Sequence, residues 1–130
     1  MSACYSVTLK VKVLDEKGAI EALKNHIDND KRTYYNLEKY KERGITTETF
    51  DDLMKIFLAD YPRQEVDITK GKLYTCYSND FNASYGWESV MMEMFETITP
   101  FIKDNSSLLI YPDSDYDELV VKDGKCVQIH

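Results

Sequence analysis

The chain has 130 residues, of which 43% are hydrophobic and 12% aromatic, so it can fold as one domain (1–130) with a core of its own. Its formal charge of −7 is unevenly spread: residues 1–44 hold nine Lys and Arg against seven Asp and Glu, whereas residues 45–130 hold seven against sixteen. An acidic surface repels phosphates, which argues against direct nucleic-acid binding. It can attract a basic protein, or it can simply keep the domain soluble.

The expected compartment is the cytoplasm. No run of apolar residues reaches the roughly 18 needed for a membrane span, and the alternating start MSACYSVTLKVKV does not resemble a signal peptide. The three cysteines are therefore expected to be reduced thiols that act as small apolar side chains. They are Cys4, Cys76 and Cys126.

The first third of the chain predicts one strand and two helices. Residues 4–14 alternate between apolar and polar side chains, as a half-buried strand does. Asp15 is a candidate N-cap for a helix that ends before the polar run 28–30. Residues 31–43 predict a second, polar helix, and Gly44 is a natural stop after it.

The middle of the chain predicts a third helix and a second strand. Thr46 or Thr47 can cap the helix, whose apolar residues recur at helical spacing until Pro62 ends it. Residues 72–78, rich in Tyr, Thr and Cys, predict a strand.

The last third predicts the strongest helix and three strands. Apolar residues recur every three or four positions over 87–102, with Pro100 expected to kink or shorten that helix. Asp123-Gly124 between two apolar runs is a strong hairpin signal. The three strands are expected at 107–111, 118–122 and 125–129.

These elements, in the order β-α-α-α-β-α-β-β-β, indicate an α+β fold. We expect an antiparallel sheet of about four to five strands with the helices packed mainly on one face. Residues 4–14 are expected to join the sheet formed by the later strands. An exposed edge of such a sheet could pair two copies, which makes a homodimer one expected assembly.

The turn before the main helix is a candidate ligand site. Its small residues bring free backbone N–H groups to a helix start, where anions bind, although no GxGxxG or P-loop motif is present. The alternative is that Ser84 caps the helix and Trp87 anchors its first turn in the core. The candidate ligand-binding residues are Asn82, Ser84, Tyr85, Gly86 and Trp87.

A row of carboxylates is the candidate surface for a basic protein partner, because carboxylates bind Arg and Lys side chains. Met92 falls off the apolar stripe of the main helix and is expected to be an exposed contact residue. The row lacks the Gly and final carboxylate of an EF-hand loop, so no metal is expected. The row consists of Asp113, Asp115, Asp117 and Glu118.

The sequence offers little for catalysis, and we expect no cofactor. It contains no HExxH, CxxC or G-x-S-x-G motif. A pair of Cys76 with His26, or two neighbouring carboxylates, stays open as a catalytic alternative, since such pairs assemble in space rather than in sequence.

Residues 65–130 carry a resemblance to a known group of proteins. The stretches FNASYGWE and LLIYPDSDYDELVVKDGK, separated by an acidic and apolar helix, resemble small proteins of unknown function from phages, plasmids and integrated elements of gut Gram-positive bacteria. The resemblance implies an accessory role, such as binding and inhibiting host restriction or CRISPR machinery. It implies no catalytic residues.

Three functions therefore remain open. The first is a non-catalytic interaction protein that engages a basic partner through acidic and tyrosine-rich surface. The second is a binder of a small, nucleotide-like ligand at the 82–88 turn. The third is an enzyme of unrecognised class.

Overall fold

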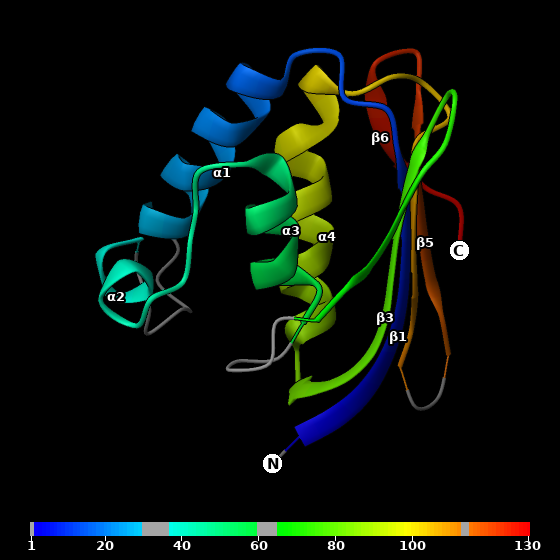
Figure 1. Ribbon diagram of the computed structural model, residues 1–130. Coiled ribbons are helices and arrows are strands. Elements are labelled where there is room, and N and C mark those ends of the chain that lie inside the picture. Colours follow the sequence, from blue (N-terminus) through cyan, green and yellow to red (C-terminus); the bar gives the residue numbers. More distant parts are fainter. Residues whose placement is uncertain (1, 30–36, 60–64, 113–114) are drawn as a thin grey trace.

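The computed structural model describes residues 2–29, 37–59, 65–112 and 115–130, and it has two layers (Figure 1). One layer is a six-stranded antiparallel sheet in the order β2-β3-β1-β4-β5-β6. The helices form the other layer, on one face of the sheet (Figure 1). The expected α+β fold is confirmed. The strands are β1 (Ser2–Val11), β2 (Asp67–Lys70), β3 (Thr75–Ser84), β4 (Ser107–Tyr111), β5 (Asp117–Lys122) and β6 (Lys125–Gln128).

Strand β1 lies in the centre of the sheet, between β3 and β4. Its alternation is as expected: the side chains of Tyr5, Val7 and Leu9 are at most 1% exposed, and the residues between them face solvent. The buried side chains meet the helices, so one face of the sheet supplies the core. The opposite face, which we call the outer face, carries no helix of the described residues (Figure 1).

Three helices cover the inner face: α1 (Glu16–Asn29), α3 (Phe50–Phe57) and α4 (Trp87–Ile98). They contact one another, while the short α2 (Leu37–Glu42) contacts α1 at the margin (Figure 1). The apolar spacing predicted for the main helix is confirmed, because its stripe is buried. The buried residues of α4 are Val90, Met91, Met94, Phe95 and Ile98.

Several helix boundaries are as expected. The Asp15 carboxylate accepts a hydrogen bond from the N–H of Gly18 at 3.0 Å, as an N-cap does. Gly44 follows α2 with φ of +78°, a left-handed conformation that suits glycine at a helix end. After Ile98 the chain tightens into a 3₁₀ turn over Thr99–Phe101, so Pro100 shortens the α-helix.

Two strand predictions and one cap need correction. The sheet has six strands because β2 was missed: DITK has one apolar residue, too few for a visible alternation. Strand β3 runs on to Ser84, through residues expected in a turn, because it pairs with the whole of β1. Helix α3 is capped by Thr49, whose hydroxyl accepts from the N–H of Asp52 at 3.0 Å, and not by Thr46 or Thr47. Pro62 and the first part of the 31–43 helix lie outside the described residues.

The hairpin between β5 and β6 is confirmed. Asp123 and Gly124 both have positive φ, 52° and 75°, as a tight two-residue turn requires. The Asp104 carboxylate accepts hydrogen bonds from both of their N–H groups, at 2.9 and 3.0 Å. Among the helices in the described part of the chain, none is long and apolar enough to cross a membrane.

Two methionines of α4, Met92 and Met94, test how the core is packed. Met94 is fully buried and Met92 is half-buried. We expect Met94→Ala to lower the free energy of unfolding by about 3 kcal/mol, since it leaves a cavity, and Met92→Ala by about 1 kcal/mol. Urea denaturation measures both values. Equal losses for the two variants would contradict this packing.

Candidate functional site

Several groups of the turn at residues 82–88 form hydrogen bonds with other parts of the chain. The Tyr5 hydroxyl donates a hydrogen bond to the Glu88 carboxylate at 2.6 Å and also lies 3.2 Å from the Ser84 carbonyl oxygen. Gly86, with φ of +91°, stands at the N-cap of α4, and no side chain caps this helix. The alternative in which Ser84 caps the helix is therefore wrong, and Glu88 fills the positive end of the helix dipole.

The other candidate residues of this turn do not converge on one place. The Trp87 indole N–H donates to the Phe57 carbonyl at 2.8 Å, and its ring packs against the core. Tyr85 is 61% exposed. Asn82 pairs with Cys4 on the outer face, on the other side of the sheet from Trp87. The expected anchoring of Trp87 is confirmed, and Asn82 lies on the other face of the sheet, away from it.

The described part of the acidic row, Asp115, Asp117 and Glu118, lies near the end of β4 and the start of β5. The Asp115 carboxylate accepts a hydrogen bond from the Tyr116 N–H at 2.8 Å and lies 3.2 Å from Nε2 of His130. The pKa of the Asp115 carboxyl lies below its usual range. The main cause is the hydrogen bond from the Tyr116 N–H, and the second is the hydrogen bond with His130. Asp115 is therefore ionised at neutral pH.

Three aromatic rings form a stacked row beside Asp115. The rings of Tyr111 and Tyr116 have centroids 5.1 Å apart, and those of Tyr116 and His130 lie 3.8 Å apart and nearly parallel. Tyr111 belongs to β4, Tyr116 precedes β5 and His130 follows β6, so sheet pairing brings the three together. The platform, as we call it, consists of Tyr111, Tyr116 and His130 with Asp115, Asp117 and Glu118.

The remaining described members of the predicted set have contacts of their own. Asp117 accepts a hydrogen bond from the Gln128 amide at 3.2 Å, and Glu118 faces outward, opposite Leu109. Met92 was expected to be exposed, but it is half-buried on α4 and packs against the core. It does not join the acidic residues, because α4 covers the opposite face (Figure 1). Asp113 lies outside the described residues.

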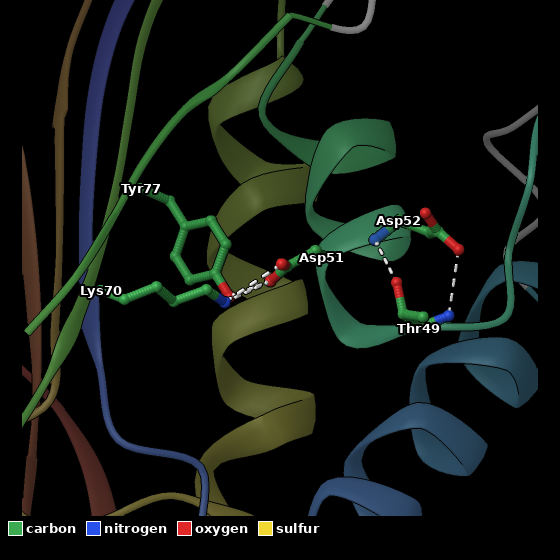
Figure 2. Close-up of polar contacts among 5 residues, drawn as sticks. All are labelled: Thr49, Asp51, Asp52, Lys70 and Tyr77. Atoms are coloured by element: carbon green, nitrogen blue, oxygen red, sulfur yellow. Dashed lines mark hydrogen bonds and ion pairs between the residues drawn. The ribbon is translucent and has the colours of Figure 1, made fainter.

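A second polar cluster joins α3 to the sheet and was not predicted (Figure 2). The Tyr77 hydroxyl donates to the Asp51 carboxylate at 2.5 Å, and Lys70 Nζ lies 3.0 and 3.2 Å from the two oxygens of that carboxylate. Residues 51, 70 and 77 come from α3, β2 and β3. Because they belong to three different elements, their spacing in the sequence does not predict that they meet. The Thr49–Asp52 capping box fixes the first turn of α3, which carries Asp51 (Figure 2).

The cluster is suited to holding the two layers together and not to acid–base chemistry. Burial, followed by the hydrogen bond to Asp51, raises the pKa of Tyr77 far above its usual value. The phenol therefore remains a hydrogen-bond donor and cannot act as a general base near neutral pH. A small open cavity of about 160 Å³ adjoins the cluster and is also lined by Glu16 and Phe50.

The catalytic pair of Cys76 and His26 is not formed. Cys76 lies in β3 opposite Lys10, on the outer face, whereas His26 lies in α1 beside Phe57 on the helical side. Burial raises the pKa of Cys126, so this thiol is a poor nucleophile. No group of three or more His, Cys, Asp or Glu suited to a metal ion occurs in the described ranges.

Comparison with known proteins adds no assignment: no protein-family model, curated protein or solved structure matches the chain.

The bond between Tyr5 and Glu88 predicts a pH-dependent stability. Burial, then the hydrogen bond to Glu88, raises the pKa of Tyr5 from 10.0 to about 12. The folded state favours the protonated phenol. The stability that the Tyr5 hydroxyl contributes is therefore complete below pH 10.0 and is lost as the pH rises to about 12. We expect Tyr5→Phe to cost about 2 kcal/mol below this window and less within it. Urea denaturation at several pH values measures the difference.

Glu88→Gln is the matched control, because it removes the carboxylate and keeps Tyr5 buried. Absorbance titration of tyrosinate should show the late ionisation step of Tyr5 moving to lower pH in this variant. A Tyr5→Phe cost that stays constant across the window would contradict the assignment.

The two partners of Asp51 should contribute unequally. Tyr77 is 2% exposed, so Tyr77→Phe leaves a carboxylate without a buried donor and should cost about 2 kcal/mol of unfolding free energy. The Lys70 side chain is 62% exposed, so Lys70→Met should cost less than about 1 kcal/mol. Equilibrium denaturation compares them, with Lys72→Met as the control for loss of a positive charge. The reverse order would show that the ion pair, not the phenol, joins α3 to the sheet.

Proposed function

We propose that this chain is a non-catalytic interaction protein that binds a basic, arginine-containing segment of another protein on the platform. The observation that carries the proposal is the stacked row of Tyr111, Tyr116 and His130 beside the ionised Asp115. In β4 the buried Leu108 and Ile110 face the core, so Tyr111 belongs to the outer face.

The chemistry of the platform fits a guanidinium group better than an ammonium group. A guanidinium is planar, stacks on aromatic faces and bonds to a carboxylate through two parallel N–H groups. Tyr111 is 48% exposed, so its ring offers an accessible surface. Asp115 is also exposed and lies next to Tyr116, so one arginine side chain could stack on a ring and bond to the carboxylate.

The charge of the whole chain supports the same class of partner. Residues 45–130 supply every member of the platform. They carry sixteen acidic and seven basic residues, an excess of nine negative charges. Such a field accelerates the approach of a basic protein and makes the association sensitive to salt. The resemblance to proteins of mobile elements makes a basic host protein the natural partner, with inhibition as the effect of binding.

Titration calorimetry with oligoarginine and oligolysine peptides of equal length tests the proposal. We expect binding that weakens as salt rises, with oligoarginine bound about two- to five-fold more tightly because only it stacks well. The triple variant Asp115→Asn, Asp117→Asn, Glu118→Gln should weaken binding by about tenfold, because it removes three carboxylates that attract the peptide.

The control triple variant changes the same number of charges elsewhere. Glu21→Gln, Glu38→Gln and Glu42→Gln are exposed positions on α1 and α2, and they should leave the affinity within about twofold. Tyr116→Ala should abolish the preference for arginine. Binding that ignores salt, or that falls equally in both triple variants, would exclude the platform as the binding site.

A further inference from the structure

Strand β6 forms one edge of the sheet, and no other strand in the described part of the chain pairs with its far side. A two-residue turn makes Lys122 and Lys125 a hydrogen-bonded pair. Alternation along the strand then directs the N–H and C=O groups of Cys126 and Gln128 away from β5. The Ile129 N–H donates to the Glu118 carbonyl at 2.9 Å, as this alternation requires, but the Glu118 N–H donates to the His130 carbonyl at 3.1 Å, so the regular ladder ends after β6.

Along Lys125–Gln128 this edge carries few of the features by which proteins usually prevent edge pairing. Natural edges carry charges, prolines or bulges along the strand. The stretch KCVQI has a single charge, at its first residue, and no proline or glycine. Val127 and Ile129 are 37% and 49% exposed. The opposite edge, β2, has a charged residue at each end, Asp67 and Lys70.

From these observations we infer that β6 pairs antiparallel with β6 of a second copy of this chain, about a two-fold axis at Val127. In this register Cys126 faces Gln128 of the second copy, so the outward N–H and C=O groups of both residues find partners. Val127 faces Val127 as the close, non-hydrogen-bonded pair, with Cα atoms about 4.5 Å apart.

The side chains are complementary in the same register. Val127 is paired with Val120 on the outer face, so four valines, two from each copy, lie in one row across the axis. Lys125 of the second copy comes to lie beside Ile129, next to the Glu118 of the first copy. The positive end of each β6 therefore meets the acidic end of the other. The two sheets form one continuous sheet of both copies, with all helices on the same side.

This inference does not depend on the proposed function. The pairing uses the edge of β6, whereas Tyr111, Tyr116 and Asp115 of the platform remain outside the pairing. Its tests measure the assembly state and not peptide binding, so either hypothesis can fail alone.

Sedimentation velocity over a series of protein concentrations is the first test. We expect a reversible dimer in the unmodified chain. Val127→Lys and Val127→Glu should each weaken dimerisation at least tenfold, because like charges then face each other across the axis. An equimolar mixture of the two variants should restore a dimer, which only a self-paired position can do. Thr69→Lys, an exposed position on β2, should leave the dimer unchanged.

Cysteine crosslinking tests the register itself. In a chain whose Cys4, Cys76 and Cys126 are replaced by alanine, Val127→Cys should form an intermolecular disulfide under mild oxidant, because the paired Cα atoms lie within disulfide reach. Lys125→Cys should not, since the two copies of that residue lie roughly 14 Å apart. A chain that is monomeric at all concentrations, or a dimer that Val127→Lys leaves intact, would overturn the inference.

Discussion

The central position of β1 is the constraint on which the rest of the structure depends. The strand pairs with β3 along its whole length and with β4 along half of it, while alternate side chains enter the core. A one-residue slip in either ladder would turn Tyr5, Val7 and Leu9 toward solvent, so burial fixes the register of both neighbours. The helices then cover only the apolar face of the sheet, and the alternate side chains of β1 on the outer face remain exposed.

The candidate sites follow from this arrangement, because strand pairing brings their residues side by side. The rings of Tyr111, Tyr116 and His130 stack because β4, β5 and β6 are adjacent and in register. Lys70 and Tyr77 meet Asp51 because β2 and β3 pass beside the first turn of α3 (Figure 2). The first group is accessible and charged, which suits recognition. The second is built around the buried phenol of Tyr77, which stays protonated, and this suits a structural role.

Four of the ten tyrosines divide in the same way. Tyr5 and Tyr77 bury their rings and donate their hydroxyls to carboxylates, Glu88 and Asp51. Each hydrogen bond joins a strand of the sheet to the first turn of a helix, so these two tyrosines hold the two layers together. Tyr85 and Tyr111 expose their rings instead. A tyrosine-rich sequence thus serves both the core and the surface, and composition alone does not separate the two uses.

Local patterns were enough to predict the α+β class, the strand 107–111, the apolar stripe of α4 and the Asp123-Gly124 hairpin, because spacing and turn chemistry act within a few residues. They missed β2 and the end of β3, which are strands only because neighbouring strands hold them. They named Asp115, Asp117 and Glu118 from charge, yet missed Lys70, Tyr77 and the stacking of His130. Those contacts join residues far apart in the chain, and only tertiary pairing, set by the burial of β1, decides which of them meet.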